Sequence, residues 1–370
     1  MRRIGGIAVV VFILAGACHD DDGVDAGAAD TADTTEPTVT AVTPVPTRTK
    51  VERLTLDLVD PSRPTPAGAG LPHADDRRLV TDVYVPAGTG PFPFIAFSHG
   101  LAGHPRKFTQ LLGQWAEAGY AVAAPAFPLS NDEVPGVSTF ADLPSQPGDV
   151  SFVIDRLLAM SDDEDDPLYG VVDPDRIGVA GLSLGGATTY GVAFNDCCAD
   201  ERPMAAMVLD GARLAVGGEF HMDSGLPLMI IHADEDFALP YAEAAEAYVD
   251  AIAPKYLVTL HEFAHASPYE NDPDPADELV TASTIAFWDR YLKDDESAEQ
   301  RIVDAITPSS LATLESETGG RPVLASDPPV RTGRAGARTA RGWSARGPRS
   351  RRRRCGPGGR RGPGRCTSRR

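Results

Sequence analysis

The amino-acid sequence predicts an α/β fold with a mostly parallel central sheet and helices on both faces of that sheet. Two observations carry this prediction. From residue 92 to residue 292, apolar runs typical of buried strands alternate with segments of helical periodicity, and such repeats build parallel sheets. Two strands that alternate apolar and polar residues precede them, at 51–60 and 78–86, and they have the pattern of half-buried antiparallel strands.

The strand–helix repeats can be followed along the chain. Buried strands are predicted at 92–100, 120–127, 176–183, 204–211, 226–234 and 255–263. Helices are predicted at 106–119, 149–161, 184–195, 239–252 and 278–292. Because the carboxyl ends of parallel strands meet at one edge of a sheet, we expect functional side chains to gather at that edge.

The first fifty residues have the composition of an export signal followed by a tether. Residues 1–17 combine a basic start with a short apolar run, and Cys18 follows directly, which resembles a bacterial lipoprotein signal whose cysteine is lipidated. Residues 18–50 lack large apolar residues and predict a disordered tether. We therefore expect an exported protein of the bacterial cell envelope, held at the membrane through lipid on Cys18. The alternative is an ordinary cleaved signal.

The charges divide the chain into an acidic body and a basic tail. The chain has 34 basic and 53 acidic residues, yet 15 of the basic residues and none of the acidic ones lie within 331–370. Nucleic acid is not expected as a partner, because so acidic a body repels phosphate. The folded domain is assigned to 51–320. Residues 321–370 predict a disordered Arg/Gly/Pro-rich tail, either a frameshift product or a basic arm.

The segment 178–190, GVAGLSLGGATTY, contains a G-x-S-x-G pattern centred on Ser183. It follows a predicted strand and opens a predicted helix, which is the context in which this pattern presents a nucleophile. The sharp turn lifts the serine hydroxyl clear of the sheet, and glycine at 181 and 185 avoids clashes with neighbouring backbone. The alternative is a serine that only fills a crowded bend.

A serine hydroxyl needs a base, usually an imidazole oriented by a carboxylate. Asp236 follows the predicted strand 226–234, and His265 lies in the loop after the strand 255–263. The chain order Ser183, Asp236, His265 is that of nucleophile, acid and base in α/β-hydrolases. Asp236 could instead be a helix N-cap. The alternatives are Asp234 and Asp210 for the acid and His261 for the base.

The stretch FSHGLAG, residues 97–103, ends another buried strand. The backbone N–H groups of Leu101 and Leu184 are expected to form an oxyanion hole beside Ser183. His99 is expected to brace this loop rather than to transfer protons. The remaining histidines of the body show no metal spacing, so no metal or other cofactor is expected.

Two further features admit simple structural readings. Cys197 and Cys198 are adjacent in NDCCADERP, and we expect either a vicinal disulfide or two buried small residues. The acidic run 161–170 lacks the glycine and glutamate offsets of a calcium loop, which predicts a solvated connection.

With these motifs in view, residues 51–306 resemble a serine α/β-hydrolase of the dienelactone hydrolase-like, platelet-activating-factor acetylhydrolase-like and polyester hydrolase-like group. The resemblance rests on FSHGLAG, AGYAVAAPAFP, RIGVAGLSLGGAT, PLMIIHADEDFALP and FAHASPY. It implies the α/β-hydrolase fold and assigns the nucleophile, acid, base and oxyanion amides to Ser183, Asp236, His265, and Leu101 with Leu184. HAD replaces the commoner His-Gly-Asp or His-Gly-Thr before the acid. The serine nucleophile, in place of the cysteine of true dienelactone hydrolases, argues against that specific reaction.

The expected activity is hydrolysis of a small-molecule or polymeric carboxylic ester through an acyl-serine. The alternatives are a peptidase or thioesterase on the same fold, or a binding lipoprotein without catalysis. The loops 130–148 and 211–224 are expected to determine the substrate.

Overall fold

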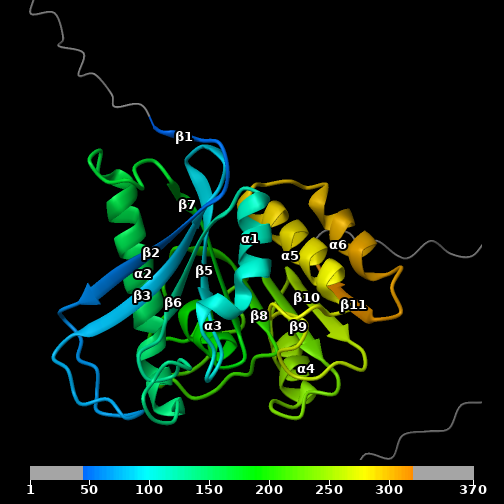
Figure 1. Ribbon diagram of the computed structural model, residues 1–370. Coiled ribbons are helices and arrows are strands. Elements are labelled where there is room, and N and C mark those ends of the chain that lie inside the picture. The colour runs from blue at the N-terminus through cyan, green and yellow to red at the C-terminus, as the bar shows by residue number, and fades with distance from the viewer. Residues whose placement is uncertain (1–44, 320–370) are drawn as a thin grey trace, which may run out of the picture. The chain divides into compact units, whose positions relative to one another are not determined.

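The computed structural model describes residues 45–319, and its centre is a nine-stranded sheet (Figure 1). The order of the strands across the sheet is β11-β10-β9-β8-β7-β5-β6-β3-β2. In chain order these strands are β2 (Glu52–Asp60), β3 (Arg77–Val85), β5 (Phe92–Ser98), β6 (Ala121–Ala126), β7 (Val172–Leu182), β8 (Pro203–Leu209), β9 (Leu228–Ala233), β10 (Lys255–Leu260) and β11 (Ala312–Glu317).

The strands from β6 through β5, β7, β8 and β9 to β10 are parallel to one another. β3 pairs antiparallel with both β6 and β2, and β11 pairs antiparallel with β10. The predicted α/β architecture, with a mostly parallel sheet that starts with two antiparallel strands, is therefore confirmed. The segments that follow the parallel strands converge on one edge of the sheet.

Helices cover both faces of the sheet, as predicted (Figure 1). One face carries α1 (Thr109–Glu117), α5 (Asp277–Leu292) and α6 (Ala298–Ile306), and the other carries α2 (Gln146–Asp162), α3 (Leu184–Phe194) and α4 (Tyr241–Asp250). Two short 3-10 helices, η1 (Pro105–Phe108) and η2 (Phe140–Ser145), precede α1 and α2.

The sheet separates two apolar cores, and the side chains of β5 point alternately into one core and the other. Ile95 and Phe97 belong to the core under α1 and α5, whereas Phe94 and Ala96 belong to the core on the opposite face. This alternation follows from the two-residue period of a strand that is buried on both sides.

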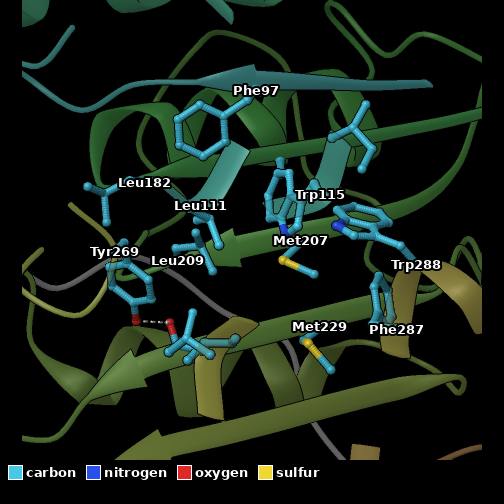
Figure 2. Close-up of a cluster of buried hydrophobic side chains, with 14 of the residues drawn as sticks. Phe97, Leu111, Trp115, Leu182, Met207, Leu209, Met229, Tyr269, Phe287 and Trp288 are labelled. Carbon is cyan, nitrogen blue, oxygen red and sulfur yellow. Dashed lines mark hydrogen bonds between the residues drawn. The ribbon is translucent and has the colours of Figure 1, made fainter. Parts of the chain in front are cut away.

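Figure 2 shows the large side chains of the core under α1 and α5. Trp115 and Trp288 meet edge to face with ring centroids 5.8 Å apart. Tyr269 lies in the same cluster, close to Leu182 and Leu209, which are the last residues of β7 and β8 (Figure 2). This core therefore extends to the edge of the sheet where the parallel strands end.

The sequence did not predict α6, β11, or a small sheet made of β1 (Thr47–Arg48) and β4 (Gly88–Thr89). β1 lies in the segment expected to be tether, and the Arg48 guanidinium donates to the Pro167 carbonyl oxygen at 2.7 Å. The folded domain therefore includes residues from at least Thr47. The predicted signal, Cys18, the rest of the tether and the tail 321–370 lie outside the described residues. Within residues 45–319, the helices lack the length and apolar content needed to cross a membrane.

Cys197 and Cys198 form a disulfide, which is one of the two predicted alternatives. Cys198 packs against a small apolar cluster formed by Leu143, Leu184, Ala187 and Val216. The acidic run 161–170 closes α2 with turns, in which the carboxylates of Asp163 and Asp166 accept backbone N–H groups. These turns fit the solvated connection that was predicted.

Candidate active site

Ser183 occupies the turn between β7 and α3 with φ 57° and ψ −114°. Residues with a Cβ rarely adopt this conformation, and it is held here by close backbone packing. A Cβ on Gly181 would collide with the Gly185 carbonyl oxygen, and a Cβ on Gly185 would collide with the Ser98 carbonyl oxygen. The two glycines are therefore required by steric contact, and the partly exposed serine is presented at the edge of the sheet.

His265 lies between Ser183 and Asp236. Its Nε2 is 2.8 Å from Ser183 Oγ, and its Nδ1 is 2.6 Å from Asp236 Oδ2. Because an ionised carboxylate only accepts, Nδ1 carries the proton of a neutral ring, and Nε2 is left to accept the serine O–H. The structure thus brings together the three side chains that the sequence singled out, in the arrangement needed to draw the proton from a serine hydroxyl.

The Asp236 carboxylate is buried and has hydrogen-bond donors at both oxygens. Oδ1 accepts the backbone N–H groups of Ala238 and Leu239 at 2.8 and 2.9 Å, within the turn that precedes α4, whose N-cap is Pro240. Oδ2 faces His265 and also lies 3.3 Å from His232 Nε2. Asp236 is therefore not the N-cap of α4, the alternative that the sequence left open, and the turn contacts and the His265 contact together hold its carboxylate in one orientation.

Asp234, the alternative acid, contacts a different histidine. Its Oδ2 lies 2.8 Å from His261 Nδ1, and its Oδ1 accepts the Glu262 N–H at 2.8 Å. Asp234 and His261 are each about one-third exposed. Two parallel Asp–His pairs therefore follow β9 and β10, and only the pair Asp236–His265 reaches Ser183.

The loop after β5 packs directly against the serine. A Cβ on Gly100 would lie 3.1 Å from Ser183 Cβ and 3.6 Å from Ser183 Oγ. The next amide along this loop is that of Leu101, and the first amide of α3 is that of Leu184. Within residues 45–319, neither amide donates a backbone hydrogen bond outside its own helix or strand, and the first N–H groups of a helix have no partner within it. Both N–H groups are thus available for an acceptor beside Ser183.

His99 braces this loop, as predicted. The buried ring donates from Nδ1 to the Gly100 carbonyl oxygen at 2.7 Å and accepts the Phe127 N–H at Nε2 at 3.0 Å. Burial lowers the pKa of His99 to about 4, since desolvation disfavours the charged form. A neutral ring with a fixed tautomer connects the loop after β5 to the loop after β6.

Two buried titratable groups lie behind His265. Asp210, the rival acid, does not contact the imidazole of His265; it accepts the backbone N–H groups of Ala233 and Ala266. Burial raises the pKa of Asp210, and the nearby His232 acts in the opposite direction.

Asp210, Asp236 and His265 each have one potential ligand atom within 4.8 Å of the other two, a spacing that metal ligands can have. All three groups have protein hydrogen-bond partners, which account for their approach without a cation.

The contact between His232 and Asp236 was not predicted from the sequence, which indicated only that the remaining histidines have no metal spacing. The N–H of His232 is shared between the Leu239 carbonyl oxygen at 3.0 Å and Asp236 Oδ2 at 3.3 Å. The sequence feature that could have indicated this contact is the position of His232 on β9, four residues before Asp236.

The surroundings of Ser183 are apolar on two sides. Leu143 from η2 packs against Leu184, directly after the serine. Phe140 of the same 3-10 helix is 60% exposed, and Phe237, directly after Asp236, is 86% exposed. Large apolar side chains that remain exposed so close to a polar site can form the contact surface for an apolar ligand.

Buried polar contacts hold the loop that carries η2. Arg77 donates to Asp142 at 2.8 Å and makes a paired contact with Asp149, and all three side chains are buried. Gln146 connects Ser130 to Thr188 of α3 by hydrogen bonds of 2.8 and 2.5 Å. The loop beside Ser183 is thus fastened to both β3 and α3.

No protein-family model matches the chain, and no curated protein matches it either. A chemical interpretation of the site therefore depends on the positions and contacts of its own residues. The contacts that carry this interpretation are the two hydrogen bonds that join Ser183, His265 and Asp236.

Proposed function

We propose that the protein is a serine hydrolase of the α/β-hydrolase type that cleaves carboxylic esters through an acyl-serine. The observation that carries the proposal is the hydrogen-bond chain from Ser183 through His265 to Asp236, with distances of 2.8 and 2.6 Å. The left-handed backbone of Ser183, at the turn from a strand into a helix, supports the same role.

The proposed reaction uses each of these groups in turn. Ser183 Oγ attacks the ester carbonyl carbon while His265 Nε2 takes its proton, and the N–H groups of Leu101 and Leu184 stabilise the oxyanion. The imidazolium then gives the proton to the leaving alcohol, and an acyl-serine remains. Water attacks the acyl-serine with His265 again as base, which releases the acid and restores the serine. Asp236 orients the imidazole and stabilises its charged form.

The apolar side chains around Ser183 support an ester with an apolar acyl or alcohol part. Phe140 in η2 and Phe237, directly after Asp236, are exposed, and such side chains suit either a small-molecule or a polymeric ester. Leu143 and Leu184 belong to a buried apolar cluster on the α3 side.

We also propose that lipid on Cys18 anchors the exported protein to a membrane of the bacterial cell envelope. The described part of the chain begins away from the site. Val45 packs against Gly170, just before β7, whereas Ser183 follows the far end of that strand. The eleven residues of β7 span roughly 36 Å at about 3.3 Å each. Replacement of Cys18 by alanine should release the protein from membranes, and a Cys18→Ala variant that stays bound would argue against the anchor.

The activity can be tested with a short-chain p-nitrophenyl ester and a fluorophosphonate probe. We expect the purified protein to hydrolyse the ester and to be labelled at Ser183. The Ser183→Ala variant should lose at least about 10⁴-fold in kcat and all labelling, whereas the control Ser297→Ala, directly before helix α6, should keep both. Full activity in Ser183→Ala would show that the proposed mechanism is wrong. Matched amide, thioester and oxoester substrates separate a peptidase or thioesterase from an esterase.

A further inference from the structure

We propose that Asp210 is a positioning residue of this site, because its single carboxylate fixes both the segment that leads to Asp236 and the loop that carries His265. The role in catalysis rests on the proposed ester hydrolysis. The contacts themselves are independent of it.

Asp210 directly follows β8, and its side chain is fully buried. Its Oδ1 accepts the N–H of Ala233 at 2.8 Å, and its Oδ2 accepts the N–H of Ala266 at 3.0 Å. Ala233 is the last residue of β9, three residues before Asp236, and Ala266 follows His265 directly. Each oxygen of Asp210 is thus hydrogen-bonded to the backbone of a different segment of the site.

The loop that carries His265 needs such a support. Two of its residues, Glu262 and Ala266, have positive φ angles of 65° and 70°, which cost energy for residues with a Cβ. Asp234 holds the beginning of the loop through His261 and the Glu262 amide. Asp210 holds its end, next to His265, so the two carboxylates fix the loop from both sides.

The groups that face Asp210 allow it to remain hydrogen-bonded whether or not it carries a proton. They are His232 on β9, His265, Asp236 and Tyr269. The Tyr269 hydroxyl lies 3.3 Å from Asp210 Oδ1 and 3.3 Å from the Ile231 carbonyl oxygen. It can donate to an ionised carboxylate, or donate to Ile231 and accept from a protonated one. In both states Asp210 still faces the two backbone amides.

An asparagine at position 210 cannot reproduce these contacts. Its carbonyl oxygen can accept one of the two amides, but its NH₂ group would then face the other N–H. One backbone donor would lose its acceptor, and the segment attached to it would be released. Asp210→Asn is therefore close to isosteric yet disrupts the proposed positioning.

The experiment compares full-length wild type with Asp210→Asn, Tyr269→Phe and Thr284→Val. In Asp210→Asn we expect faster amide hydrogen exchange in residues 261–269, a fall in kcat of about 100-fold, and a KM within about threefold of wild type, since a misplacement near 1 Å costs that much in rate. Tyr269→Phe keeps both amide contacts and should change kcat by less than about threefold. Thr284→Val removes a buried hydrogen bond to Trp115, far from the site, and should lower the melting temperature without changing kcat.

Unchanged exchange in residues 261–269 of Asp210→Asn would overturn the positioning role, and so would a kcat within threefold of wild type. If the wild type neither hydrolyses esters nor reacts with the fluorophosphonate, the proposed function is wrong. Hydrogen exchange would still decide whether Asp210 orders the loop, so the two failures can be told apart.

Discussion

Replacement of Gly100 by alanine should abolish most activity while leaving the fold intact. The added Cβ would lie 3.1 Å from Ser183 Cβ, 3.3 Å from the Leu182 carbonyl oxygen and 3.6 Å from Ser183 Oγ. These contacts are tight but do not overlap backbone atoms severely, and a displacement of a few tenths of an ångström accommodates the methyl group. Its cost in stability should stay near 1 kcal/mol, at the low end of the range for overpacking.

The effect on catalysis should be far larger. The methyl group would lie beside the serine hydroxyl, on the residue before the Leu101 amide, and the proposed reaction forms its oxyanion beside that amide. Loss of one oxyanion donor costs about 10² to 10³ in kcat, or about 2.7–4 kcal/mol. We therefore expect Gly100→Ala to lose activity on that scale with little change in folding.

The assay is kcat and KM for a p-nitrophenyl ester, combined with urea denaturation of the same preparations. Gly113→Ala is the matched control, because a Cβ at this position in α1 meets nothing within 4 Å. It should stabilise the fold by about 0.5–1 kcal/mol and leave kcat unchanged. If Gly100→Ala keeps kcat within about twofold of wild type, the oxyanion site does not lie beside this loop.

Three other outcomes follow from the contacts of the site and its supports. Asp236→Asn should lower kcat by about 10⁴-fold through loss of the correct His265 tautomer, whereas Asp234→Asn should stay within about tenfold; equal losses would show that the acid is misassigned. His99 has a pKa of about 4 in the folded protein against about 6.5 when unfolded, so the unfolded chain takes up a proton first as the pH falls. Stability should therefore drop by up to about 3 kcal/mol between pH 6.5 and pH 4, as measured by urea titration, and an equal drop in His99→Gln would contradict this origin. Arg77→Met leaves the buried Asp142 without its counter-charge and Asp149 with Arg63 alone, and it should destabilise the fold by about 3–5 kcal/mol in calorimetry; a loss below about 1 kcal/mol would mean that the network is not a support.

The sheet could be predicted from the sequence because its parallel strands contain apolar runs, whereas β2 and β3 alternate apolar and polar residues. β11 could not, since its sequence ATLESE is mostly polar and it pairs only along β10, at the edge of the sheet. β1 has two residues, and its position depends on the distant contact between Arg48 and Pro167. Elements of this kind are defined by their partners in the fold and leave no periodic pattern in their own residues.

The order of Ser183, Asp236 and His265 along the chain predicted which segments meet, but it could not decide between two aspartates in one short loop. Both follow β9, and each has a histidine partner after β10. The choice depends on the turn that directs Asp236 toward the Ala238 and Leu239 amides, and this turn has no signature in the sequence. His232 and Asp210 were recognised as residues, but their contacts depend on strand order, which a single sequence does not reveal.

The backbone explains why these particular positions meet. Each of β7, β8 and β9 is followed by a residue whose N–H donates to the neighbouring strand near its end: Ser183 to Leu209, Asp210 to Ile231, and Asp234 to Leu260. The backbone hydrogen bonds of the sheet thus extend by one residue beyond these strands. They position the first residue of each following loop without any side-chain contact. Ser183 and Asp210 are two of these first loop residues, so their backbone is positioned directly by the sheet. Asp236 lies two residues past Asp234, and His265 lies five residues past Leu260, so their positions depend on the turns held by Asp210 and Asp234. We therefore expect substitutions at those two carboxylates to act on the geometry of His265, and substitutions in the strand ends to act on stability.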